Sequence, residues 1–333
     1  MSADEIALSR IQNLKARLTE RDRLILRTLA THRLLTTHQI AELAFDSPVT
    51  ARHRMQDLEA MQAVDRFRPR ADRGSHPSHF VLSPAGAAVV AVDAEQETKP
   101  AIRRARRDRE LGLKSPHRLR HLLGVNGFHT ALAAHARTHP DTAVKLWRSE
   151  RELPQIGTYS HRPRPDAVLT WQEGTAQSTL ALEYDTGTER LARLAEKVDR
   201  YATLFARARH GVDGYEFDDL FHPHDPNDPL RPREPRDPHD PVVLFVFTTT
   251  RRATEARTAL RRTPTTAPTA TGVWTPGTSP AEALWLPLNA QPPRMRLAQL
   301  VAAASTSAAP GRMQSAAPPA ADVRSRDDEV EPW

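Results

Sequence analysis

The fold of this chain is decided by residues 162–205, which read RPRPDAVLTWQEGTAQSTLALEYDTGTERLARLAEKVDRYATLF. Two short runs in this stretch, residues 167–171 and 178–185, have the composition of strands and are separated by a turn-containing connection. The run that follows, residues 189–205, places apolar side chains at the spacing of one helix face. The stretch therefore predicts two neighbouring strands followed by an amphipathic helix.

Carboxylates stand at the ends of these two strands. Asp166 opens the first strand behind Pro165, and Glu183 and Asp185, two residues apart, project from one face of the second. Carboxylates that converge on a sheet edge can hold a hard divalent cation, since Mg²⁺ prefers oxygen ligands. Such a metal can activate water and stabilise the charge that develops on a phosphodiester. The sequence predicts a Mg²⁺ or Mn²⁺ site at Asp166, Glu183 and Asp185; the alternative is a solvated strand end.

The arrangement resembles the core of the PD-(D/E)xK nucleases, in which a Pro-Asp on one strand faces a Glu-x-Lys on the next. Pro165-Asp166 fits the first half of that pattern. The second half fits only in part, because Asp185 stands where the lysine belongs. The resemblance implies that either Lys197 reaches in from the following helix or the site does not cleave DNA. The catalytic residues that it implies are Asp166, Glu183, Asp185 and Lys197, with Glu150 assisting.

Composition limits the class of protein. With 333 residues the chain has room for two domains, while 39% hydrophobic residues, 5% aromatics and 28 prolines predict modest cores and some unstructured sequence. The absence of cysteine excludes disulfides and thiolate metal sites and suits a cytoplasmic protein. No apolar run approaches the roughly 18–20 residues of a membrane span, and the polar N-terminus shows no secretory signal. We expect a cytoplasmic protein that does not contact a membrane.

The formal net charge of +6 predicts a polyanionic partner. Residues 99–120 alone carry more than this whole surplus, because nine Lys and Arg stand there against only Asp108 and Glu110. A solvated linker is the alternative explanation of such a run. Beside a DNA-binding domain, contact with phosphates is the favoured one.

Three capped helices and a hairpin are predicted before this basic run. Thr19 with Asp22 and Thr36 with Gln39 form capping boxes, and Ser47-Pro48 supplies an N-cap followed by a proline at the first helical position. Residues 64–67 and 79–82 then read as the strands of a β-hairpin. This order of elements is that of a winged helix.

In a winged helix the third helix enters the major groove of DNA and the hairpin lies along the backbone. Ala51, Met55 and Leu58 form the expected buried stripe of that helix. A helical interaction domain with an ordinary polar face is the alternative. The residues expected to contact DNA, on the opposite face and on the hairpin, are Thr50, Arg52, His53, Arg54, Gln56, Arg66, Arg68 and Arg70.

The second half of the chain alternates strands and helices. Residues 117–138 predict a helix weakened by Gly124 and Gly127, and its recurrent histidines have no spacing that favours a metal site. Residues 143–150 predict a strand, 242–250 a buried central strand, 251–262 a basic helix and 283–288 a last strand, with a loop at 264–272.

Prolines recur at every third position from Pro223 to Pro241, which is the period of a polyproline II helix. Because this segment is also rich in acidic residues, we expect a stiff, solvated spacer rather than a surface for DNA. His222-Pro223-His224 within it resembles the His-x-His motif of HUH nickases. That alternative is disfavoured, since the motif belongs on a central strand.

Several stretches together resemble the replication-relaxation family, found mainly on actinobacterial plasmids and mobile elements, over residues 18–260. They are LTERDRLILRTLATHRLLTTHQIAEL (18–43), HLLGVN (121–126), LWRSE (146–150), RPD (164–166) and LEYDTGTE (182–189), leading to Lys197 and Tyr201. The resemblance implies a DNA-binding protein of plasmid replication, relaxation or mobilisation. The implied partners are double-stranded DNA and other plasmid replication or mobilisation proteins. The alternatives are a non-catalytic DNA-binding accessory protein and a transcriptional regulator.

The predicted fold class is mixed α/β, a winged helix followed by a restriction-endonuclease-like αβββαβ domain. The predicted divisions are a lead-in (1–17), the winged-helix DNA-binding domain (18–95), a basic linker (96–116), the PD-(D/E)xK-like domain (117–290) with a Pro/Asp-rich insert (213–241), and a disordered tail (291–333).

Overall fold

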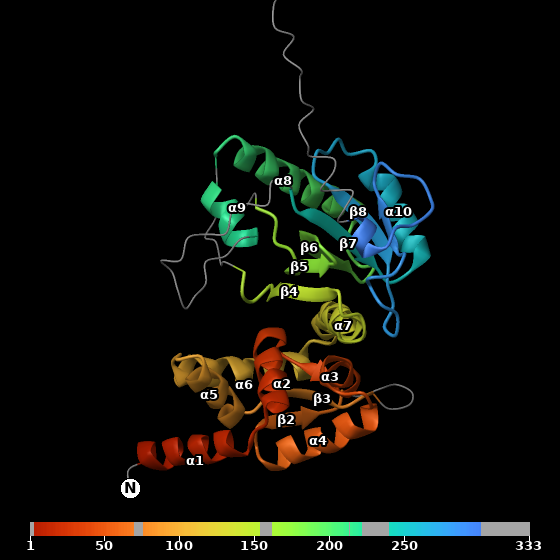
Figure 1. Ribbon diagram of the computed structural model, residues 1–333. Helices are drawn as coiled ribbons and strands as arrows, with labels where there is room; N and C mark the ends of the chain where they lie inside the picture. Colours follow the sequence, from red (N-terminus) through yellow and green to blue (C-terminus); the bar gives the residue numbers. More distant parts are fainter. Residues whose placement is uncertain (1–2, 70–75, 154–161, 213, 222–239, 301–333) are drawn as a thin grey trace, which may run out of the picture.

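The computed structural model describes residues 3–69, 76–153, 162–212, 214–221 and 240–300 (Figure 1). An N-terminal helical part with a small three-stranded sheet precedes a part built on a six-stranded mixed sheet. The N-terminal elements are α1 (Ala3–Arg17), α2 (Glu20–His32), β1 (Leu35–Thr36), α3 (Thr37–Ala44), α4 (Pro48–Ala60), β2 (Val64–Phe67), β3 (His79–Leu82), α5 (Pro84–Asp93) and α6 (Thr98–Lys114). The second part contains α7 (Pro116–Thr138), β4 (Thr142–Ser149), β5 (Ala167–Glu173), β6 (Ala176–Asp185), α8 (Leu191–Arg209), α9 (Gly214–Phe221), β7 (Val242–Phe247), α10 (Thr250–Leu260), β8 (Thr269–Val273) and β9 (Trp285–Pro287).

The three predicted helix starts are confirmed. Asp22 and Thr19 close the capping box of α2, with the Thr19 backbone N–H donating to Asp22 at 2.8 Å. Thr36 and Gln39 form the same box at α3. Ser47 caps α4, and Pro48 occupies its first turn. Each cap satisfies backbone N–H groups that would otherwise lack a partner, which fixes where the helix begins.

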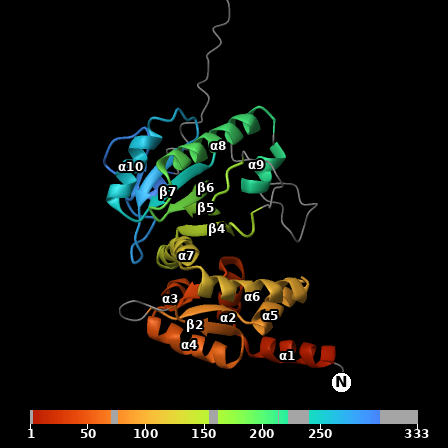
Figure 2. The same cartoon turned by 180° about the vertical axis from the view of Figure 1, so that it is seen from behind.

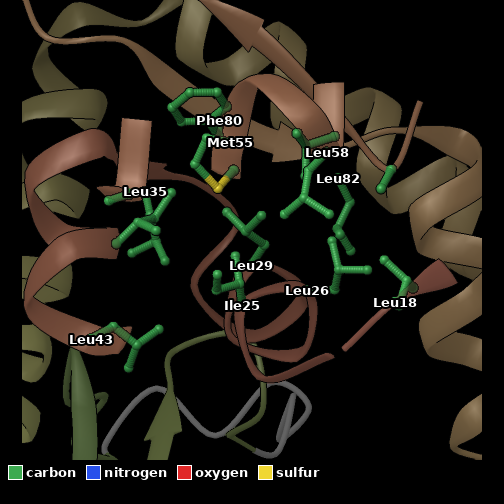
Figure 3. Close-up of a cluster of buried hydrophobic side chains, with 14 of the residues drawn as sticks. Leu18, Ile25, Leu26, Leu29, Leu35, Leu43, Met55, Leu58, Phe80 and Leu82 are labelled. Atoms are coloured by element: carbon green, nitrogen blue, oxygen red, sulfur yellow. The ribbon is translucent and has the colours of Figure 1, made fainter. Parts of the chain in front are cut away.

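The predicted hairpin is also confirmed, as β2 and β3 pair antiparallel in a sheet of order β1-β3-β2. The segment between the two strands includes residues 70–75, which lie outside the described residues, and with them the predicted DNA contact Arg70. Figure 3 shows the core beneath, where the predicted stripe of Met55 and Leu58 meets Ile25 and Leu29 of α2. Burial of these side chains holds α4 against the module, with its other face outward.

The segment predicted as a basic linker forms helix α6. Ala105, Asp108 and Gly112 recur at helical spacing and are buried, and α6 packs mainly on α5. The sequence analysis missed this helix because the arginines conceal a buried stripe made of small residues and one acid. The carboxylate is tolerated inside because Arg33 and Arg151 both pair with Asp108.

The six-stranded sheet has the order β4-β5-β6-β7-β8-β9. Its first three strands are antiparallel neighbours, while β7 runs parallel to both β6 and β8. All of β7 is buried, as predicted for a central strand. Helix α7 covers one face of the sheet, and α8 and α10 cover the other (Figures 1 and 2).

Besides α6, two elements differ from the predictions. Strand β8 forms in the segment predicted as a loop, where Gly272 lets the strand lie against Trp285; a Cβ at Gly272 would stand 2.8 Å from that ring. Helix α9 forms at the start of the predicted insert, and Phe217, Leu220 and Phe221 pack into the core on the α8 face. The proline-rich remainder, residues 222–239 with the His-Pro-His motif, lies outside the described residues.

The predicted start of the tail at residue 291 is wrong, because residues of the fold continue to 300. Leu297 and Leu300 are buried against the α7 face of the sheet, so these residues belong to the fold. Residues 301–333 lie outside the described residues. Within the described part of the chain, none of the helices combines the length and apolar character needed to cross a bilayer.

Helix α7 runs without a break through Gly124 and Gly127. A Cβ at Gly124 would lie 2.2 Å from the ring of Tyr184, so glycine is required for the helix to approach strand β6 this closely. The glycines that weakened the helix prediction therefore allow close packing.

Candidate functional site

The pairing of β5 with β6 brings two of the predicted carboxylates to the same rim of the sheet. The Asp166 N–H donates to the Leu182 carbonyl at 2.9 Å, and Ala167 lies opposite Leu182. Asp166 is therefore opposite Glu183, and directly opposed residues project from the same face. Asp185, two residues on, shares that face with Glu183.

Glu183 is buried and holds contacts on both of its oxygens. Lys197 of α8 donates to Oε2 at 2.9 Å, and the Tyr201 hydroxyl donates to Oε1 at 2.8 Å. Burial, which disfavours a charge, raises the pKa of Glu183 to about 7 in spite of Lys197. Lys197 thus reaches in from the following helix, which is one of the two alternatives that the nuclease resemblance left open.

Lys197 also donates to Glu189 at 2.8 Å. Burial opposes its charge, but Glu183 and Glu189 outweigh that effect and raise the pKa of Lys197. Burial likewise raises the pKa of the Tyr201 hydroxyl well above its usual value. Lys197 is therefore a permanent cation and Tyr201 a permanent hydrogen-bond donor near neutral pH.

The other two carboxylates bind different cations. His121 Nε2 lies 2.9 Å from Asp166 Oδ1, and the Tyr184 N–H donates to Oδ2 at 2.7 Å. Burial lowers the pKa of His121, but Asp166 outweighs it and the net pKa is raised. Asp185 accepts from Arg252 of α10 at 2.9 Å and from the Gly187 N–H at 2.5 Å.

As arranged, these carboxylates do not fit the donor set of a divalent metal. Glu183 binds Lys197, Asp185 binds Arg252, and each oxygen of Asp166 already has a hydrogen-bond partner. Among the described residues, no group of three His, Asp or Glu is placed to hold a metal ion. The cluster is instead a network in which Lys197, Arg252 and His121 each contact one of the three carboxylates.

A groove opens beside Asp166, between the two parts of the protein. It consists of two adjacent hollows of about 510 and about 570 Å³. The lining residues that the two hollows share are Arg33, His121, Leu122, Glu150 and Asp166. Glu150, predicted to assist the site, therefore lies in the groove, as does Lys197 at one end.

The residues predicted to contact DNA fall into two groups. Thr50, Arg52, His53 and Gln56 are exposed on the outer face of α4. Arg54 instead donates to the fully buried Asp22 at 2.8 Å, an intramolecular contact that ties α4 to α2. On the hairpin the partners are intramolecular too: Arg66 pairs with Glu59 and Arg68 donates to Ser78.

Sequence reasoning did not assign three residues of the cluster. His121 and Tyr201 belong to the stretches that resemble the replication-relaxation family, but neither was given a role at the site. The spacing of Tyr201 four residues after Lys197, on the same face of α8, is the signal that could have placed it. No local pattern connects Arg252 with Asp185, because 67 residues separate them.

The fold and the site define a two-part α/β protein, in which a capped helical module adjoins a mixed sheet with a carboxylate–cation cluster at its rim. The chain belongs to the replication-relaxation family, whose family model matches residues 26–215. The match begins within α2 and includes the whole cluster except Arg252. This membership connects the protein with plasmid replication and relaxation. Comparisons with curated proteins and with solved structures gave no match.

Proposed function

We propose that the protein binds double-stranded DNA of a plasmid or mobile element and serves its replication, relaxation or mobilisation as a non-catalytic DNA-binding protein. Other replication or mobilisation proteins would be its partners. The observation that carries the proposal is the outer face of α4, where Thr50, Arg52, His53 and Gln56 are exposed above a fully buried stripe. Arginine and glutamine on an exposed helix are the side chains that read base edges in the major groove.

The order of the N-terminal elements supports a winged helix as the DNA-binding module. Helices α2, α3 and α4 precede the β2–β3 hairpin, and α4 lies at the end of the protein far from the six-stranded sheet (Figure 1). In a winged helix this third helix docks in the major groove. The outward position of α4 leaves it free to do so.

The second part supports a nuclease-like scaffold. Apart from α9, its elements follow the order αβββαβ from α7 to β7, with an antiparallel β4-β5-β6 meander and β7 parallel to β6. The ion pairs of Glu183 and Asp185 favour a structural role for the carboxylates. On this proposal the domain positions DNA or a partner without cleaving it.

Arg52→Ala tests the proposed interface. We expect its affinity for duplex DNA to fall about tenfold, because one arginine contact is lost. A fall of roughly 0.9 in the slope of log K against log salt identifies that contact as one with a phosphate, and an unchanged slope identifies it as one with a base. Fluorescence anisotropy with a labelled duplex at several salt concentrations measures both. Arg251→Ala removes the same charge from an exposed site on α10 and serves as the control. Equal affinities for Arg52→Ala and the wild type would contradict the proposal.

Metal-dependent cleavage of DNA is the second candidate. It is favoured because Lys197 contacts Glu183, and Glu183 lies opposite Asp166. It requires Asp166 and Glu183 to exchange their present partners for Mg²⁺ or Mn²⁺. Purified protein and Asp166→Ala are incubated with supercoiled plasmid and either metal, and nicked circles are measured on a gel. We expect no nicking by either protein. Nicking by the wild type that disappears in Asp166→Ala would establish the nuclease instead.

A further inference from the structure

We propose that the groove between α6 and the second sheet is a separate binding site for a single DNA strand, with the phosphates held by arginines of α6 and α7. That the ligand is DNA follows from the proposed function, on which this proposal rests. It does not rest on α4, because the groove lies in another part of the molecule.

Helix α6 turns its arginines outward because its other face is buried. Ala105 and Gly112 face the module, and the acidic Asp108 between them is buried and neutralised by Arg33 and Arg151. The helix's second acid, Glu110, pairs with Lys114. The exposed cations of α6 that form no ion pair within the described residues are Lys99, Arg103, Arg104, Arg106 and Arg107.

Two of these arginines belong to the groove. Arg104 and Arg107 line it from α6, and Arg118 lines it from the first turns of α7. All three are exposed, and none is in an ion pair within the described residues. The two Arg of α6 are three residues apart and therefore neighbours on the helix surface. These three cations are available to an anion that enters the groove.

The acids that line the groove do not cancel this charge. Asp108, Asp185 and Glu189 are each paired with a cation of the protein. Asp166 bonds with His121, whose raised pKa favours the charged ring. The unpaired charge at the rim is therefore mainly that of Arg104, Arg107 and Arg118, and only Glu150 opposes it among the described residues.

The shape of the groove favours a single strand over a duplex. The major groove of a duplex is read by an element that protrudes into it, as α4 is placed to do. Here the site is concave, with hollows of about 510 and about 570 Å³ whose walls come from both parts of the protein. Proteins typically bind single strands in a positively charged groove that follows the backbone.

The groove and α4 lie on different sides of the N-terminal module. Figures 1 and 2 show α4 at the end remote from the six-stranded sheet, whereas α6 lies next to α7. A duplex on α4 and an unpaired strand in the groove can therefore be bound at the same time. Such an arrangement suits a protein that acts where duplex meets opened DNA.

The test uses the full-length double variant Arg104→Ala/Arg107→Ala and a labelled single-stranded oligonucleotide of mixed sequence. We expect its affinity to fall about tenfold and the slope of log K against log salt to fall by roughly 1.4, since each phosphate contact with a single strand contributes about 0.7. Affinity for duplex DNA stays at the wild-type value. The matched control is Arg109→Ala/Lys114→Ala, which removes the same charge from α6 at positions that pair with Asp65 and Glu110.

Each other outcome overturns the proposal. The wild type could fail to bind the single strand, or Arg104→Ala/Arg107→Ala could bind it with unchanged affinity. The control variant could lose as much affinity for the single strand as Arg104→Ala/Arg107→Ala, or the latter could lose as much affinity for duplex as for the single strand. Failure of the α4 proposal is read separately, from Arg52→Ala and duplex DNA. Circular dichroism checks that both double variants remain folded. We expect that they do, because substitutions of exposed residues usually change stability little.

Discussion

Lys197→Met is expected to destabilise the protein by about 3 kcal/mol at pH 8 and by less than about 1 kcal/mol at pH 5. At pH 8 the substitution leaves the Glu183 carboxylate buried without its cation, since Lys197 donates to it at 2.9 Å. At pH 5 Glu183 is protonated in the folded protein and has little need of the cation. Urea denaturation of the variant and the wild type at the two pH values measures the difference.

The sign of this dependence follows from the raised pKa of Glu183. Burial raises that pKa from 4.5 to about 7, so between these values the folded protein keeps a proton that the unfolded chain has released. The stability from this proton is complete below about pH 4.5 and is lost as the pH rises through 7. Without Lys197 the pKa of Glu183 in the folded protein rises further, so the loss of stability continues to higher pH. At pH 8 the variant is therefore less stable than the wild type.

Two further variants separate the buried pair from a general loss of charge. Lys197→Met/Glu183→Gln removes both charges, and we expect it to recover most of the stability at pH 8, because the neutral amide that replaces the carboxylate is not a buried ion. Lys114→Met breaks an exposed pair with Glu110 and is expected to change little at either pH. A loss in Lys197→Met that is equal at pH 5 and pH 8 would contradict this account of Glu183.

The parts of the fold that could be predicted are those with a local signal. The capping residues Thr19, Thr36 and Ser47 fixed three helix starts, because each satisfies backbone groups of its own helix. Alternation and strand ends placed Asp166 and Glu183 on neighbouring strands, since sequential strands usually pair. The helical spacing after β6 predicted the helix that carries Lys197, and the nuclease resemblance singled out Lys197 on it.

The parts that could not be predicted depend on contacts between distant residues. Arg54 has the position of a DNA-reading side chain on α4, but the buried Asp22 on α2 binds it. Asp185 has the position of a metal ligand, but Arg252 binds it across 67 residues. In both cases the residue type and the local spacing fit the predicted role, and the sequence gives no sign of the tertiary partner that the side chain contacts in the fold.

Asn126→Ala is expected to destabilise the protein by about 2–4 kcal/mol at pH 7. Asn126 is 1% exposed and connects α7 to the end of α2. Its amide donates to the carbonyl oxygens of His32 at 3.0 Å and Leu34 at 2.7 Å, and its Oδ1 lies 3.0 Å from His32 Nδ1. Alanine leaves these buried groups without partners at the junction of the two parts of the protein.

The junction around Asn126 is also sensitive to acid. Burial lowers the pKa of His32 from 6.5 to about 4, although the hydrogen bond between its Nδ1 and the acceptor Oδ1 of Asn126 acts in the opposite direction, so the folded protein keeps the ring neutral. A base with a depressed pKa contributes stability above its unfolded value, near 6.5, that is lost as the pH falls towards 4. As the pH falls over nearly the same range, proton uptake by Glu183 stabilises the folded protein. The effects of His32 and Glu183 on stability therefore oppose each other in the wild type. Glu183→Gln should therefore unmask a fall in stability between pH 6.5 and 4.

Thermal and urea denaturation at pH 7 measure the contribution of Asn126. Thr138→Ala is the matched control on α7, because its exposed hydroxyl bonds only within the same helix and to His139 next in sequence. Asn126→Asp keeps the acceptor for His32 but replaces both donors, so we expect it to lose at least as much stability as Asn126→Ala. If Asn126→Asp is as stable as the wild type, the two hydrogen bonds that Asn126 donates do not hold the two parts of the protein together, and packing around α7 must do so.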